Sequence, residues 1–279
     1  MRSLILLWAA AFIAPAADNP LAPAADNTLT PAEKKAGFRL LFDGRTMNGW
    51  RDPATETPPG DSWLIEDGCL KTRPKPRIGE DLITRDSFAD FELLFDWRIS
   101  PKGNAGVKYR IQRAVFLDNT KVSRGEGGFE AMLGRELANP RSDRARMAPD
   151  ATGQEYTISY EFQLIDDSAY PGLMQRDGLH ATGALYSMLP PTAKAARPCG
   201  EWNQARIVLK GVHVEHWING VKVLDGSVNS EQARAGISKR WAAAPAIRDM
   251  LLNAKPSGPL SLQHHGAAVW FKNLKLRPL

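Results

Sequence analysis

Apolar and polar residues alternate along several short segments of the chain. In the stretch FELLFDWRIS, every second residue from Phe91 to Ile99 is apolar, and most of the residues between them are charged. The stretch YEFQLID has the same period over Tyr160–Asp166. A period of two residues is typical of a β-strand with one buried face. These segments therefore predict strands whose apolar faces pack in a common core.

Turn residues separate many such segments. Asn219-Gly220 lies between two apolar runs and predicts a tight hairpin, because both central positions of that turn need a positive φ. Short strands with Gly, Pro and Asn between them favour an all-β fold, a jelly-roll β-sandwich. Residues 112–157 and 230–256 break the alternation, and we expect loop insertions there, the second partly helical. Six tryptophans are expected to fill the core or to line a groove, with the core as the default: Trp50, Trp63, Trp97, Trp202, Trp217 and Trp270.

The N-terminal residues predict export. A short basic start precedes an apolar run over residues 4–14, and Ala14-Pro15-Ala16 fits the small-x-small rule for cleavage. Residues 1–17 are therefore predicted to be a secretory signal peptide rather than a membrane anchor, with a buried N-terminal helix as the alternative. Residues 18–36 are rich in Ala, Pro and Asn and predict a flexible tether. Residues 37–279 would form a single domain of a periplasmic or secreted protein.

Charge and cysteine content narrow the possible partners. The formal net charge is +5, but no Lys/Arg run with interleaved aromatic residues is present, so nucleic acid is not an expected partner. Cys69 and Cys199 are the two cysteines. They could pair in an exported protein, and the sequence leaves this open. No Cys/His cluster has the spacing of a zinc site.

The predicted strand faces that turn away from the core carry the candidate chemistry. Carboxylates, amides, guanidinium groups and imidazoles bind sugar hydroxyls or transfer protons, although the same residues are also ordinary on an exterior face. These outward residues are Asp96, Arg98, Lys108, Arg110, Glu161, Gln163, Gln263 and His265.

Two positions have competing interpretations. Asp166 joins the face of Glu161 and Gln163 only if a bulge shifts the register, and otherwise it caps the following turn. In the stretch QHHG, His265 shares a face with Gln263 and is the better candidate for proton transfer, whereas His264 is expected to be packed.

Seven motifs occur in order between residues 37 and 279: GFRLLFDGRTMNGW, NAGVKYR, YEFQLIDD, GALYSM, GEWNQARIVLKG, HWINGVKV and LQHHGAAVWFKNLKL. Together they resemble the 3-keto-disaccharide hydrolase domain family, also named 3-keto-glucoside 1,2-lyase / 3-keto-2-hydroxy-glucal hydratase. The resemblance implies a concanavalin A-like jelly roll and an exported bacterial protein that acts on oxidised glycosides. The chain departs from the family at Ala105 (usually NSG), at Phe162 (usually Glu-Tyr-Gln) and at His264 (usually QDHG), while Glu161 and His265 are retained. Histidine in place of the usual aspartate at position 264 could alter substrate preference. It could also remove a carboxylate that binds a metal or relays protons.

The implied reaction removes the acidic C2 proton of a 3-keto-glycoside, eliminates the C1 oxygen and adds water back. It needs a base, an acid and positive charge near the developing oxyanion. We expect Glu161 or His265 to be the base and the other the acid, with Arg110, alone or together with Lys108, stabilising the enediolate. A divalent ion held by Glu161, Asp166 and His265 could replace the arginine. The residues expected to bind substrate are Asn104, Lys108, Gln163, Tyr186, Trp202 and Gln263.

Two other functions fit the same pattern. A non-catalytic carbohydrate-binding module would bind unmodified glycans without turnover. A conventional glucan hydrolase would need two carboxylates beside the bond, which Gln163 disfavours. The sequence leaves open the aglycone, the anomer, the oligomeric state and the upstream sugar 3-dehydrogenase that would supply the ketone.

Overall fold

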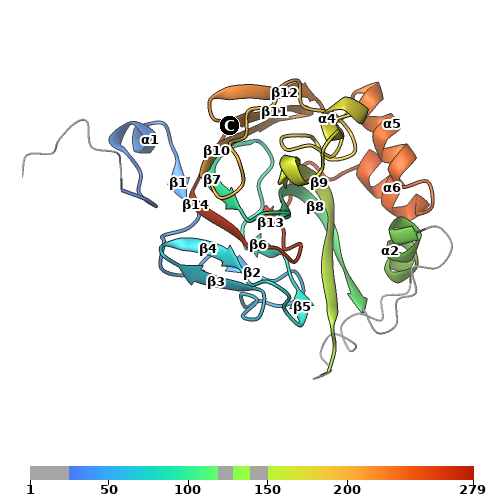
Figure 1. Ribbon diagram of the computed structural model, residues 1–279, viewed down its shortest axis with the longest axis horizontal. Helices are drawn as coiled ribbons and strands as arrows, with labels where there is room; N and C mark the ends of the chain where they lie inside the picture. The colour runs from blue at the N-terminus through green and yellow to red at the C-terminus, as the bar shows by residue number, and fades with distance from the viewer. Residues whose placement is uncertain (1–24, 119–127, 139–149) are drawn as a thin grey trace, which may run out of the picture.

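The strands form two sheets that share one core (Figure 1). The computed structural model describes residues 25–118, 128–138 and 150–279. The larger sheet has the order β12-β11-β10-β7-β14-β4-β3, and β1 also pairs with β14. Its strands are β1 (Arg39–Leu40), β3 (Trp63–Glu66), β4 (Cys69–Thr72), β7 (Phe91–Ile99), β10 (Asn203–Lys210), β11 (His213–Ile218), β12 (Val221–Ser227) and β14 (Val269–Pro278).

The smaller sheet has the order β2-β6-β13-β8-β9-β5. Its strands are β2 (Trp50–Arg51), β5 (Ile78–Gly79), β6 (Leu82–Thr84), β8 (Asn104–Asp118), β9 (Gly153–Ile165) and β13 (Ser261–Leu262). Strand β5 pairs with β9 in parallel, and the other pairings recorded in this sheet are antiparallel. Strands β8 and β9 are the longest of the described strands. Since Asn104–Arg110 and Tyr156–Ile165 lie on them, these two strands form the framework of the candidate site.

The core lies between the inward faces of the two sheets. Every second residue of β7 from Phe91 to Ile99 is buried, as the alternation predicts. Phe95 packs against Phe162 of the smaller sheet, with ring centroids 5.9 Å apart in an edge-to-face arrangement. The predicted all-β, concanavalin A-like jelly-roll sandwich is therefore confirmed.

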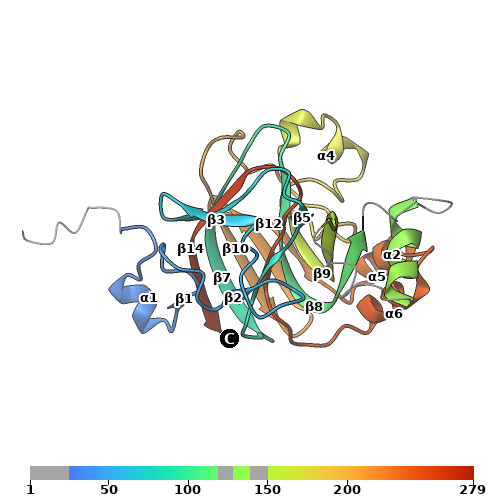
Figure 2. The ribbon, with the colours of Figure 1, turned by 90° about the horizontal axis from the view of Figure 1, so that it is seen from below.

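Helices gather beside one side of the smaller sheet. Figures 1 and 2 show α2, α5 and α6 next to β8 and β9. The helical elements are α1 (Pro31–Lys35), α2 (Gly128–Ala138), the 3₁₀-helix η1 (Asp167–Ala169), α4 (Leu173–Arg176), α5 (Glu231–Arg240) and α6 (Pro245–Leu252). The helical part of the expected 230–256 insertion is thus confirmed. The expected 112–157 insertion instead begins and ends inside β8 and β9 and contains α2. Among the described residues, no helix is long and apolar enough to cross a membrane.

The described part of the expected tether, residues 25–36, contains helix α1 and contacts the C-terminal strand. Thr30 and Glu33 form a capping box at the start of α1, with Pro31 at the first helical position. The Glu33 carboxylate also accepts from the Nζ of Lys275 at 2.7 Å. Asn27 and Asn273 exchange hydrogen bonds between their main-chain N–H groups and side-chain oxygens. These contacts attach residues 25–36 to strand β14. The expected signal peptide lies outside the described residues.

The tryptophans divide between the core and one outer face. Trp50, Trp63 and Trp97 are buried, as expected. Trp217 and Trp270 lie on strands of the larger sheet and are partly exposed, and Trp202 precedes β10. Their rings contact Arg and Lys side chains that also lie on that sheet. The two cysteines are both free thiols.

The hairpin at Asn219-Gly220 is confirmed. Both residues have positive φ, 49° and 81°, and they join β11 to β12.

A buried histidine connects the two sheets. His216 of β11 is fully buried, and its Nε2 lies 3.0 Å from the hydroxyl of Tyr109 on β8. Its Nδ1 lies 2.9 Å from the carbonyl oxygen of Gly183. Because a carbonyl can only accept, Nδ1 carries a proton and donates, and in the neutral ring Nε2 accepts from the Tyr109 hydroxyl. Burial lowers the pKa of His216 to about 4, against the backbone hydrogen bond to Gly183, which raises it.

We expect the contribution of His216 to the free energy of unfolding, read as the difference between the unchanged protein and His216→Gln, to fall as the pH drops from about 6.5 to about 4. In this range the unfolded chain protonates His216 and the folded chain does not, so protons favour the unfolded state. A pKa difference of this size corresponds to about 3 kcal/mol. Urea unfolding at a series of pH values measures the effect, with His216→Gln as the comparison. Identical pH dependence in the two proteins would contradict the assignment.

Candidate active site

Polar side chains from three adjacent strands share the outer face of the smaller sheet. Lys108 of β8 stands directly opposite Glu161 of β9, and Gly106 stands opposite Gln163. Ser261 of β13 pairs with Lys108 from the other side. Residues opposite each other in an antiparallel pair point to the same face, so Lys108, Glu161, Gln163 and Ser261 are neighbours. The predicted shared face of Lys108, Glu161 and Gln163 is therefore present.

An ion pair that the sequence did not reveal lies at the centre of this face. The Nζ of Lys108 lies 2.9 Å from the carboxylate of Asp81, and both side chains are 1% exposed. Thr157 donates to the same Asp81 oxygen at 2.6 Å and lies 3.1 Å from Lys108 Nζ. The main-chain N–H of His264 donates to the other Asp81 oxygen at 3.0 Å. Burial alone would lower the pKa of Lys108, but the charges of Asp81 and Glu161 outweigh it and raise that pKa.

Glu161 is buried beside this pair. Loss of hydration raises the pKa of Glu161 to about 7, with a smaller contribution from the negative charge of Asp81. Lys108 and Arg240 act in the opposite direction. A Cβ at Gly106 would lie 2.4 Å from the Glu161 Oε1, so only glycine leaves room for this carboxyl group. A carboxyl group with a pKa near neutrality can both accept and return a proton.

A second cation reaches the site from a helix. Arg240, the last residue of α5, donates to the hydroxyl of Tyr156 at 3.1 Å. Its guanidinium group also lies over the ring of Tyr186, 4.5 Å from the centroid. The main-chain N–H of Tyr186 donates to the carbonyl oxygen of Glu161 at 3.0 Å. The expected participation of Tyr186 is thus compatible with the structure, whereas Arg240 was not predicted. A basic residue at the end of a helix is common, so nothing in the pattern distinguished it.

Unpaired acceptors surround Glu161 on the same face. Gln163 donates through Nε2 to the side-chain oxygen of Asn104 at 3.1 Å. In the described part of the chain, the Oε1 of Gln163, the Oε1 of Gln263 and the hydroxyl of Ser261 are buried without a hydrogen-bond partner. Buried polar atoms are almost always paired in native proteins. These atoms therefore suit a bound ligand that carries several hydroxyl groups.

The structure does not place Arg110 on the face that carries Glu161, so the predicted outward position of Arg110 is wrong. The register of β8 and β9 shifts between Tyr109 and Arg113, and Arg110 has a φ of 52°. This bulge breaks the simple alternation from which the outward position was inferred. The guanidinium group of Arg110 instead donates to the carbonyl of Gly211, at the turn between β10 and β11. The cations that act on Glu161 are Lys108, which was considered together with Arg110, and Arg240.

Trp202 and Asp166 also lie elsewhere. The Trp202 ring contacts Arg98 and Lys272 on the larger sheet, at 5.0 and 4.5 Å, so it does not wall the site at Glu161. Asp166 caps η1 by accepting from the N–H of Ser168, and it accepts from the N–H of Lys102 at 2.8 Å. This is the turn-capping role that competed with a site role at the sequence level.

His264 and His265 separate as predicted. His264 is buried against Trp63, and its Nε2 lies 2.8 Å from the carbonyl oxygen of Arg73. His265 is exposed and lines a small pocket of about 270 Å³ together with Gly79 and Gln154. The pKa of His265 is lowered by partial loss of hydration and by the positive charge of Lys108. Among the described residues, no hydrogen bond joins His265 to Glu161, so no direct proton relay between them is present.

The donor set expected for a divalent ion is not assembled, because Asp166 is held at η1. In the part of the chain that the structure describes, one group of three potential ligands comes together: His213, Glu215 and Asp225. This group lies on β11 and β12, and the ammonium of Lys222 already bonds to Glu215 and Asp225.

Comparisons with known proteins agree with the architecture. Residues 37–277 match the model of the family described as "3-keto-alpha-glucoside-1,2-lyase-like domain". A curated relative from Bacteroides thetaiotaomicron, named 3-keto-disaccharide hydrolase, is 28% identical over 256 residues, which cover 87% of this chain and 79% of the relative.

Solved structures from Parabacteroides distasonis share the fold. One, described as a candidate glycosyl hydrolase, is 29% identical with a TM-score of 0.65 and covers 91% of this chain and 100% of its own. A second, with the same description, is 20% identical with a TM-score of 0.52 and covers 94% of this chain and 93% of its own; it supports the fold alone. Because the family match spans nearly all of the domain that carries Glu161 and Lys108, the chain belongs to the 3-keto-alpha-glucoside-1,2-lyase-like domain family.

Proposed function

We propose that this protein cleaves 3-keto-glycosides by elimination and hydration, with Glu161 as the base. One observation carries the proposal: a buried carboxyl group with a pKa of about 7 is influenced by two cations, Lys108 and Arg240. A carboxyl group of this pKa is about half ionised at neutral pH, and the cations can stabilise an enolate-type oxyanion. Family membership and the named relative support a keto-sugar substrate.

The proposed reaction proceeds in two stages. Glu161 takes the C2 proton, and the electron pair of that C–H bond forms the enediolate with the C3 oxygen. The C3 carbonyl then re-forms, a double bond forms between C1 and C2, and the bond from C1 to the glycosidic oxygen breaks. That oxygen takes up a proton and leaves as the aglycone alcohol. Water then adds to the double bond, with hydroxyl on C1 and hydrogen on C2, and gives the free 3-keto sugar.

The residues around Glu161 have distinct parts in this scheme. Lys108 and Arg240 stabilise the enediolate, and protonated Glu161 supplies the proton that the leaving oxygen requires. The free oxygens of Gln163 and Gln263 accept hydrogen bonds from sugar hydroxyls. His265 could protonate the leaving group from the neighbouring pocket, but its lowered pKa keeps most of it neutral at pH 7, so Glu161 is the better proton donor.

The surroundings of Asp81 disfavour a conventional glycosidase. Such an enzyme needs two carboxyl groups free to act as acid and as nucleophile or base. Both oxygens of Asp81, the carboxylate nearest to Lys108, already accept hydrogen bonds from Lys108, Thr157 and His264. An elimination that starts with one free carboxylate matches this arrangement better.

The proposal extends to the cellular context. The C3 ketone must come from oxidation of the C3 alcohol, so a sugar 3-dehydrogenase would act upstream. The N-terminal leader expected over residues 1–17 would place the reaction in the periplasm or outside the cell.

The substrate class is tested by incubating the protein with an aryl glucoside and with its 3-keto derivative. We expect aglycone release from the 3-keto compound alone, because only the ketone acidifies C2. Equal release from both compounds would indicate a conventional hydrolase, and no release from either compound would indicate a binding module.

Glu161→Gln is expected to lower kcat on the 3-keto-glucoside by about 10²- to 10⁴-fold, the usual contribution of a general base. The substitution keeps the shape of the side chain, and a thermal melt checks folding. Glu215→Gln, on the larger sheet, is the matched control and should retain activity. Full activity of Glu161→Gln would refute the assignment of the base.

Arg240→Ala is expected to shift the acid limb of the pH profile to higher pH. In the unchanged protein, kcat/KM should fall below about pH 7, since the base must be ionised. Arg240 lowers the pKa of Glu161, so its removal raises the midpoint. Lys239→Ala, an exposed position on the same helix, should leave the midpoint in place. An unchanged midpoint in Arg240→Ala would show that this cation does not act on the base.

A further inference from the structure

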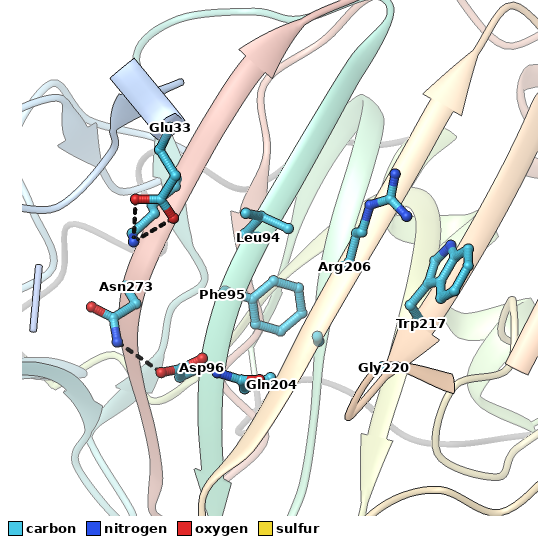
Figure 3. Close-up of a pocket in the computed structure, with 11 residues that line it drawn as sticks. Glu33, Leu94, Phe95, Asp96, Gln204, Arg206, Trp217, Gly220 and Asn273 are labelled. Atoms are coloured by element: carbon cyan, nitrogen blue, oxygen red, sulfur yellow. Dashed lines mark hydrogen bonds and ion pairs between the residues drawn. The ribbon is translucent and has the colours of Figure 1, made fainter. Parts of the chain in front are cut away.

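A second pocket lies on the outer face of the larger sheet, on the opposite side of the sandwich from Glu161. Its volume is about 390 Å³, within the range of roughly 300–1,000 Å³ that small-molecule sites occupy. Figure 3 shows residues of β7 and β10 between Glu33 on one side and Trp217 on the other. The Glu161 site uses none of these residues.

The floor of this pocket is apolar. Leu94 occupies an outward position of β7, between the charged residues Glu92 and Asp96, and it is only partly buried. Trp217 lines the pocket from β11, and Arg206 of β10 lies between it and Leu94. The outward, partly exposed Leu94 provides an apolar surface for the C–H face of a ligand.

The rim of the pocket carries polar groups with unused hydrogen-bonding capacity. The carboxylate of Asp96 accepts from Asn273 at 2.7 Å through one oxygen, and its burial raises its pKa. The side chain of Gln204 is exposed, with no hydrogen bond recorded for its amide in the described residues. Arg206 is fixed by one hydrogen bond from its Nε to Glu92 at 2.6 Å and by contact with the Trp217 ring. Its terminal N–H groups remain as donors.

The charges at the pocket are largely balanced. Glu33 and Lys275 neutralise each other at the α1 side, with the Nζ of Lys275 2.7 and 2.9 Å from the two carboxylate oxygens. Glu92 is shared by Arg206 and Arg277, and among the described residues the Asp96 carboxylate is bonded by the neutral amide of Asn273. The surplus guanidinium charge and the Asp96 charge offset each other, so a strongly charged ligand meets no net counter-charge of the kind that phosphate or sulfate sites use. The pocket therefore favours a neutral ligand with several hydroxyl groups and an apolar face.

From the floor, the rim and the charge balance, we propose that this pocket is a second, non-catalytic sugar-binding site that takes a neutral hexose unit. The ring packs on Leu94, and its hydroxyl groups bond to Asp96, Gln204 and Arg206. Helix α1 completes the site through Glu33, which gives the ordered segment 25–36 a role in binding. The proposal stands independently of the reaction at Glu161, because the two sites share no residue.

Isothermal titration with unmodified maltose, cellobiose and lactose tests this site. The full chain should bind at least one of them, and Glu161→Gln should bind it equally well. We expect Asp96→Asn to raise Kd by about tenfold, as for a hydrogen bond to a charged group, and Gln204→Ala by about fivefold. Lys210→Ala, exposed on the same strand, is the control and should bind as the unchanged protein does.

Three results would overturn the proposal. They are no binding of any of the three disaccharides, binding that Glu161→Gln abolishes, or binding that both pocket variants leave unchanged. Gln204 is exposed, so its substitution keeps the test valid even if Asp96→Asn disturbs folding. Unmodified sugars report on this pocket, and turnover of a 3-keto-glucoside reports on the Glu161 site, so the two proposals fail separately.

Discussion

The candidate site depends on one buried ion pair, Lys108 with Asp81. An ammonium group removed from water must be compensated, and Asp81 does this together with Thr157. Both oxygens of Asp81 in turn accept hydrogen bonds from three donors, so this carboxylate is unavailable for chemistry. Glu161, opposite Lys108 on the next strand, has no such set of donors among the described residues, and burial raises its pKa. Two carboxyl groups near one cation thus acquire different functions because their hydrogen bonds differ.

Two features of the fold produce this arrangement: the register of three strands and the connection from β5 to β6. Strands β13, β8 and β9 place Ser261, Lys108 and Glu161 in one row. The short connection from β5 to β6 carries Asp81 to that row, because β5 pairs with β9 while β6 pairs with β13. Gly106 leaves the space that Glu161 fills. The departures from the family pattern at Ala105 and Phe162 are buried in the core, and the His264 side chain is packed against Trp63, so they leave this row intact.

The alternation of apolar and polar residues correctly predicted the features that depend on local strand geometry. It placed the core residues of β7, the shared face of Lys108, Glu161 and Gln163, and the different environments of His264 and His265. It failed at Arg110, where a bulge with positive φ turns the side chain away. Asp81 and Arg240 reach the site through tertiary contacts, for which a single sequence gives no signal. The sequence contains one sign that residues 25–36 include a helix. Thr30-Pro31-Ala32-Glu33 is a capping box with proline at the first helical position.

The central claim is that burial beside Lys108 sets the ionisation of Glu161, and a direct titration of that carboxyl group tests it. Glutamate labelled with carbon-13 at the carboxyl carbon allows each group to be followed by NMR, and Glu161→Gln identifies the resonance. The account predicts one resonance with a midpoint near pH 7, absent from the variant. A midpoint for Glu161 near 4.5, the ordinary value of a glutamate, would contradict it.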